Sequence, residues 1–170
     1  KDTWKLTWTG KNIDLLALSE TWNNHTPISF KNWICKDLHK DRNLNTYGGV
    51  AALARSDVKI VRRQDFEKTD IETMWFQVAF ENKHITMASV YIPPTCTNHF
   101  KKFEENLEEV MSKTTGPILI MGDFNARSYT WETWHTSHPP RHDLAWKQGK
   151  ILENIIIKHG LQILNSGEPN

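Results

Sequence analysis

The chain has 170 residues, 38% of them hydrophobic, which is enough for one domain with a sizeable core, so we expect a single domain over residues 1–170. Its 21 lysines and arginines balance 20 acids, and the resulting net charge of +1 gives no general argument for a nucleic-acid partner. No apolar run approaches the roughly 20 residues that cross a bilayer, which excludes a membrane-spanning class.

The first half of the chain has the pattern of short strands. Residues 13–18, IDLLAL, predict a buried strand that places Glu20 just beyond its end. Gly48 and Gly49 then precede VAALAR, VKIVRR, MWFQVAF and HITMASVYIPP, which are separated by turn residues. This order predicts antiparallel, meander-like strands.

The second half alternates helices with strands. Apolar residues at helical spacing predict an amphipathic helix over residues 99–113, which ends near Gly116-Pro117. The apolar run of PILIMGDFNAR, residues 117–127, predicts a buried strand that ends in a sharp turn at Gly122. A second helix is expected from about residue 145 to 158, followed by a strand at LQIL. Helices that cover a sheet favour a layered α/β or α+β domain.

Two acids follow buried strands although 103 residues separate them. Glu20 and Asp123 both lie where side chains leave the core, so we expect them to meet in one cleft. A pair of carboxylates is suited to a hard divalent cation, Mg²⁺ or alternatively Mn²⁺, and thus to phosphate chemistry. In that chemistry Asp123 would orient or deprotonate a water, Asn125 would donate a hydrogen bond to phosphate, and Tyr91 could add a phenolic donor.

Several motifs together resemble one known family. DLLALSETW, YGGVAALAR, SVYIPP and MGDFNAR stand in this order, followed by Trp131, Gly149, Leu152 and HGLQILNSGEPN. They are similar to the endonuclease/exonuclease/phosphatase superfamily, especially the apurinic-type endonuclease domain of non-LTR retrotransposons, over roughly residues 13–170. The resemblance implies a DNase I-like fold, a two-layer β-sandwich flanked by helices.

The resemblance also implies a function and roles for the residues. It implies a divalent metal ion and hydrolysis of phosphodiester bonds in DNA, where a nick primes reverse transcription. Glu20 would be the metal ligand, Tyr91 a phosphate or transition-state contact, and Asp123 with Asn125 the water-orienting and phosphate-binding pair. A parent chain with a reverse transcriptase domain is implied, acting in the nucleus. Two distant cysteines, Cys35 and Cys96, also suit reduced thiols in an intracellular protein.

This sequence departs from the family pattern at both ends. The family carries an Asn in a strand upstream of the position of Ile13, and Asn12 is too close to serve. It also closes with an Asp and a Ser-Asp-His motif, whereas the only Ser-Asp here is Ser56-Asp57, followed by Val58. We therefore expect a domain truncated at both termini, weak or inactive alone, from an active parent.

The segment after the strand at 118–123 favours contact with nucleic acid. Arg127, Trp134 and Arg141 place cations and an aromatic ring beside the expected site, where they could meet phosphates and stack on bases. Nearby histidines could instead suggest zinc, but no cysteine accompanies them. Trp131 and Trp146 are better explained as packing residues.

Other interpretations stay open at this point. Glu20 could be an acid that caps a helix, and Asp123 with Asn125 could form a turn. Within enzymes, a phosphoesterase acting on lipid or inositol phosphates shares the core motifs. A non-catalytic relic or binding module would keep the fold without the chemistry.

Overall fold

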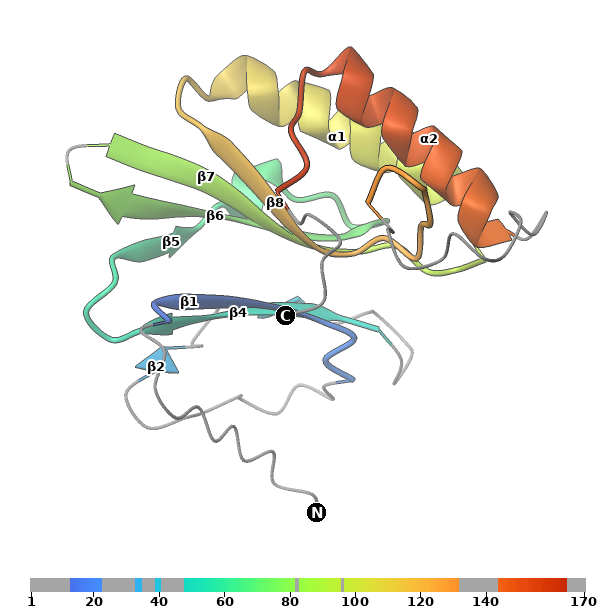
Figure 1. The fold of residues 1–170 in the computed structure, drawn as a ribbon. Helices are drawn as coiled ribbons and strands as arrows, with labels where there is room; N and C mark the ends of the chain where they lie inside the picture. The colour runs from blue at the N-terminus through green and yellow to red at the C-terminus, as the bar shows by residue number, and fades with distance from the viewer. Residues whose placement is uncertain are drawn as a thin grey trace.

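A computed structural model describes residues 13–22, 33–34, 39–40, 48–81, 83–95, 97–131 and 144–164. Figure 1 shows two stacked sheets, with two long helices covering the outer face of one of them. In chain order the elements are β1 Leu15–Ser19, β2 Trp33–Ile34, β3 His39–Lys40, β4 Val50–Arg55, β5 Ile60–Arg62, the short 3₁₀ helix η1 Gln64–Phe66, β6 Glu72–Phe80, β7 Lys83–Tyr91, α1 Asn98–Lys113, β8 Ile118–Asp123 and α2 Leu144–Lys158.

The strands form two sheets with different topologies. In the first sheet β4 pairs antiparallel with β1, β2 and β3. The second sheet has the order β5-β6-β7-β8, and β7 and β8 run parallel. Parallel strands require a crossover, which α1 provides between β7 and β8. The ends of β7 and β8 therefore meet at one edge of the molecule.

Two apolar clusters hold the layers together. The cluster between the sheets contains mostly aliphatic side chains: Val50, Ala52, Met74, Phe76, Met87 and Tyr91. The cluster between the second sheet and the helices is rich in aromatic rings: Phe66, Trp75, Phe100 and Phe103, with Ala88, Val90, Ile92, Leu107, Val110 and Ile155. The expected two-layer β-sandwich with helices is confirmed, and the described helices lie on the second sheet alone.

Two consecutive buried hydrogen bonds fix α1 against the second sheet. The Trp75 indole donates a hydrogen bond to Asn106 Oδ1 at 2.8 Å, and Asn106 Nδ2 donates to the Phe66 carbonyl at 2.7 Å. Both side chains are at most 1% exposed, so these bonds satisfy groups that would be costly to bury unpaired.

The predicted helices are confirmed, with α1 and α2 each beginning one residue earlier than expected. The predicted strand at LQIL is wrong, because residues 161–164 have no strand pairing. Instead the Leu161 N–H bonds to the Ile156 carbonyl at 2.9 Å, and Gly160 has a left-handed φ of 62°. The start of this segment thus closes the end of α2 as a cap. None of the helices in the described ranges could cross a membrane.

Candidate active site

Glu20 lies at the edge where the two sheets meet. It directly follows β1, is exposed, and has a left-handed φ of 52°. Its Oε1 accepts a hydrogen bond from the hydroxyl of Tyr91, the last residue of β7. An acid of the first sheet is therefore held against a tyrosine of the second.

Asp123 stands beside Tyr91 on the neighbouring strand. The two residues are register partners in the parallel pair of β7 and β8, and the Ile92 N–H donates to the Asp123 carbonyl at 2.9 Å. Gly122 makes this close pairing possible, because a Cβ there would lie 1.9 Å from the Val90 carbonyl oxygen. Glu20 and Asp123 thus both neighbour Tyr91; that their carboxylates share one cleft stays a prediction.

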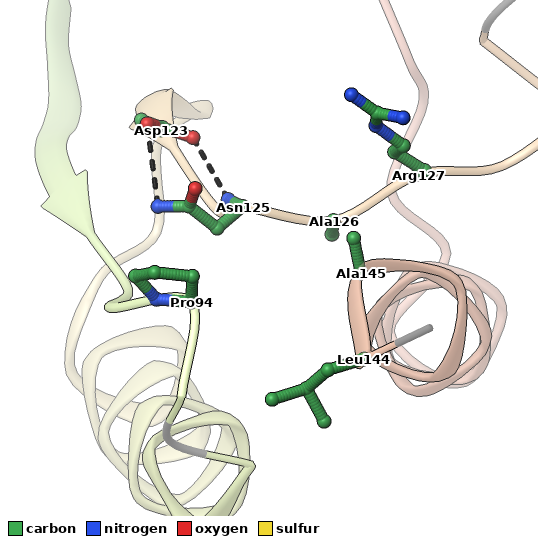
Figure 2. Close-up of a pocket in the computed structure, with 7 residues that line it drawn as sticks. All are labelled: Pro94, Asp123, Asn125, Ala126, Arg127, Leu144 and Ala145. Atoms are coloured by element: carbon green, nitrogen blue, oxygen red, sulfur yellow. Dashed lines mark hydrogen bonds between the residues drawn. The ribbon is translucent and has the colours of Figure 1, made fainter. Parts of the chain in front are cut away.

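Asn125 binds Asp123 within a tight turn. Its backbone N–H donates to Asp123 Oδ1 at 2.8 Å, and its Nδ2 donates to Oδ2 at 3.3 Å (Figure 2). The same Nδ2 donates to the Ile92 carbonyl at 3.0 Å. The turn interpretation therefore describes this segment correctly. Donation from Asn125 to a phosphate would replace one of these two side-chain bonds.

A pocket of about 560 Å³ opens beside Asp123 and Asn125. It is lined by Pro94, Asp123, Asn125, Ala126, Arg127, Leu144 and Ala145 (Figure 2). Its walls come from the segments that follow β7 and β8 and from the first turn of α2. The exposed Arg127 adds a cationic residue to the lining of the pocket, across from Asp123 (Figure 2).

The backbone of Arg127 is fixed on α2. Its N–H donates to the Ala145 carbonyl at 3.0 Å. Gly149 allows this approach, since a Cβ there would lie 1.7 Å from the Arg127 carbonyl oxygen. The helix therefore sets the position of this pocket residue.

A second polar contact holds the loop that follows Arg127. The buried Ser128 hydroxyl donates a hydrogen bond to Glu153 Oε1 on α2, and the Thr130 hydroxyl donates to the same oxygen at 2.9 Å. The Ser128 bond, aided by Thr130 and Lys150, lowers the pKa of Glu153 below its ordinary value despite partial burial.

The tryptophans of this region are packing residues where the structure describes them. The Trp131 indole donates to the Ala126 carbonyl at 3.4 Å, and Trp146 packs on the Tyr129 ring at 4.6 Å between centroids. Trp134 and Arg141, predicted to bind substrate, lie outside the described residues, as do Cys35, Cys96 and the histidines of the zinc alternative.

Sequence reasoning missed Glu72, at the start of β6. Its register partner is Tyr91, and its Oε2 accepts a hydrogen bond from the Gly49 N–H at 2.6 Å. A signal was present, because strand alternation places Glu72 on the same face as the buried Met74 and Phe76. An acid at a core-facing position at a strand end indicates a specific partner.

A group of possible metal ligands also lies on the helices. Glu104, Glu108 and His159 bring their ligand atoms within 4.8 Å of one another. Lys158 Nζ pairs with Glu104 at 2.7 Å and with Glu108 at 2.8 Å, which raises the pKa of Lys158. These contacts form a surface ion-pair network between α1 and α2, separate from the strand ends that carry Asp123.

Comparison with known proteins agrees with this fold. Residues 85–170 match the family model described as endonuclease-reverse transcriptase. The RNA-directed DNA polymerase from mobile element jockey of Drosophila funebris is 24% identical over 125 residues, 74% of this chain and 12% of that protein. The chain therefore spans about an eighth of the length of this curated relative.

Two solved structures share the architecture. The endonuclease domain of TRAS1, a telomere-specific non-LTR retrotransposon, superposes with a TM-score of 0.67 and 17% identity, covering 92% of this chain and 63% of that one. The 3′ phosphatase NExo from Neisseria, bound to product DNA hairpin, has a TM-score of 0.53 and 15% identity, covering 85% and 60%. These similarities confirm the DNase I-like fold. Because the family model matches half of its length, the chain belongs to the endonuclease-reverse transcriptase family, within the endonuclease/exonuclease/phosphatase superfamily.

Proposed function

We propose that this domain serves a metal-dependent DNA endonuclease that nicks target DNA for retrotransposition, in a parent chain with a reverse transcriptase. The observation that carries this proposal is the meeting of Glu20, Tyr91 and Asp123 at one edge of the sandwich, although the acids come from different sheets. Family membership and the likeness to the jockey polymerase support a nucleic-acid substrate and a reverse transcriptase partner. Action on chromosomal DNA would place the parent chain in the nucleus.

The donor set at this edge suits a hard divalent cation. Glu20 and Asp123 supply carboxylate oxygens, which Mg²⁺ and Mn²⁺ prefer, and no described residue of this edge supplies a thiol. Glu20 would hold the ion, since its side chain is exposed and therefore accessible to an ion from solvent. When bound, the ion would polarise a phosphoryl oxygen and stabilise the leaving alkoxide.

The remaining residues would prepare the substrate and a water. Tyr91 would orient Glu20 through their hydrogen bond. Its hydroxyl has a single proton, so donation to a phosphate oxygen would replace the bond to Glu20. Asp123 would orient or deprotonate the attacking water, because Asn125 holds its carboxylate in one orientation. Arg127, exposed at the pocket, would pair with a backbone phosphate.

Titration of the chain with Mn²⁺ tests the metal site directly. Glu20→Gln should weaken Mn²⁺ binding at least tenfold in calorimetry, because a neutral amide is a poorer ligand for a hard cation. Glu105→Gln is the matched control, since Glu105 is an exposed acid on α1. Equal Mn²⁺ affinity in wild type and Glu20→Gln would contradict the proposed metal ligand.

Plasmid nicking tests the chemistry. In the parent chain with Mg²⁺, Asp123→Asn should reduce the nicking rate about 10²- to 10⁴-fold, the usual contribution of a general base. For residues 1–170 alone we expect weak nicking or none. Full nicking activity from residues 1–170 would refute the expectation that activity needs the family's upstream Asn and its closing Asp and Ser-Asp-His motif. A preference for inositol phosphates in a substrate panel would refute the assignment of DNA as the substrate.

A further inference from the structure

Glu72 belongs to a row of polar side chains that crosses three strands of the second sheet. In register, Glu72 of β6 faces Tyr91 of β7, and Tyr91 faces Asp123 of β8. The next register row consists of Met74 on β6, Ser89 on β7 and Met121 on β8, and it lies on the same face of the sheet. Met74 and Met121 of that set pack into the cluster between the sheets. Glu72 therefore faces the first sheet, at the same edge as Tyr91.

The Glu72 carboxylate reaches the first sheet through Gly49. Its Oε2 accepts the Gly49 N–H at 2.6 Å in a partly buried setting. A carboxylate that accepts from a backbone N–H forms a charge-assisted bond, which is stronger than a neutral one. Gly48 and Gly49 are both buried and have left-handed φ values of 91° and 88°, so this bond acts on a backbone segment that favours glycine.

The same glycine pair holds the two residues that follow Glu20. The Trp22 N–H donates to the Gly48 carbonyl at 2.9 Å, and the Thr21 N–H donates to the Gly49 carbonyl at 3.3 Å. A continuous series of hydrogen bonds thus runs from Glu72 through the glycine pair to the backbone beside Glu20.

We propose that Glu72 is a positioning residue for the metal ligand Glu20. By fixing the glycine pair, Glu72 would keep the chain after Glu20 in place and the Glu20 carboxylate against Tyr91. The inference rests on the proposed function for the role of Glu20, and it adds a residue from β6 to that site. Partners that orient ligands commonly change metal affinity 10- to 100-fold when they are removed.

Three variants separate positioning from charge. Glu72→Gln keeps a side-chain carbonyl that can accept the Gly49 N–H but has no charge. Glu72→Ala removes the acceptor, and Glu72→Asp draws the carboxylate back by one methylene. Glu105→Ala, at an exposed acid of α1, is the control, and circular dichroism verifies folding of each variant.

The first measurement needs no metal. Amide hydrogen exchange of the metal-free chain, read by NMR, should show a protected Gly49 N–H in wild type. Exchange should quicken about 10- to 100-fold in Glu72→Ala and stay within about threefold in Glu72→Gln and the control. If Glu72→Ala does not fold, Glu72→Asp should show the faster exchange. Equal Gly49 exchange in wild type and the folded variant would overturn the inference.

The second measurement is Mn²⁺ affinity by calorimetry. It should fall about 10- to 100-fold in Glu72→Ala and change less than about threefold in Glu72→Gln. A Glu72→Gln variant that keeps a protected Gly49 N–H but binds Mn²⁺ as weakly as Glu72→Ala would show that Glu72 acts through its charge, which overturns positioning. If wild type binds no Mn²⁺, the proposed metal site fails, while the Gly49 exchange rates still decide whether Glu72 fixes the glycine pair.

Discussion

The two acids of the site are held in different ways. Asp123 is held locally, because Asn125 binds both of its carboxylate oxygens from two positions along the chain. Glu20 is held from a distance, because its partner Tyr91 is 71 residues away on the other sheet. The Asp123 side of the site therefore depends on the second sheet and its helices, whereas the Glu20 side depends on how the two sheets pack.

The largest expected effect comes from the scaffold that both sides share. Trp75→Ala should lower the free energy of unfolding by about 3–5 kcal/mol, because it empties a fully buried aromatic site and leaves Asn106 Oδ1 without its donor. Chemical denaturation measures this loss. A loss below about 1 kcal/mol would show that the aromatic cluster is not the main scaffold.

A smaller effect should be confined to the Asp123 side. Gly122→Ala should cost about 1–3 kcal/mol, since Gly122 has a φ of 147° and an added Cβ would meet the Val90 carbonyl. NMR shifts should change around Asn125, while the Gly49 amide keeps its protection. Equal disturbance of both sites would mean that the two sides are not independent.

The Glu20 side should respond to a change between the sheets. The buried Ser89 hydroxyl donates to the Leu18 carbonyl of β1 at 3.0 Å, so Ser89→Ala should cost about 0.5–1.5 kcal/mol in unfolding free energy. Amide exchange at Thr21 and Trp22 should quicken more than exchange near Asn125. Ser112→Ala, at an exposed α1 serine, is the control and should leave these rates unchanged.

The smallest effect is expected at the loop contact of Glu153. Its pKa in the folded chain is below the ordinary value of 4.5, so its contribution to stability is present above that value and is lost as the pH falls through the lowered pKa. Glu153→Gln should thus be less stable than wild type near neutral pH, and the difference should shrink in acid. Urea denaturation at several pH values measures it, and a difference that is constant with pH would contradict the assigned cause.

Much of the fold could be predicted from apolar periodicity. The apolar run of β8 and the helical spacing of α1 each predict one element, and both were located to within about two residues, although β8 is only partly buried. The two-residue strands β2 and β3 could not be predicted, because so short a pairing has no periodic pattern. LQIL has a strand-like composition, but closure of the helix end at Leu161 decided the local structure there.

Less of the site was available from the sequence. Glu20, Tyr91 and Asp123 were predicted because motifs place them at strand ends, and the position of Tyr91 beside each of the two acids follows from the topology. The bond between Glu72 and Gly49 joins different sheets across 23 residues, and no local pattern encodes such a contact. The inward donation of Asn125 also depends on the Ile92 carbonyl, whose position only the paired strands determine.

The hydrogen bond between Asn106 and Trp75 favours one packing of α1 on the second sheet over others. Apart from Asn106, the buried face of α1 is apolar, and apolar contacts are not directional, so they discriminate weakly against a helix shifted by one turn, about 5.4 Å. Lys102 and Val110 lie four residues before and after Asn106, and neither side chain can accept a hydrogen bond from the Trp75 indole N–H. A helix shifted by four residues in either direction would leave that proton buried without an acceptor, so this amide disfavours both of those packings.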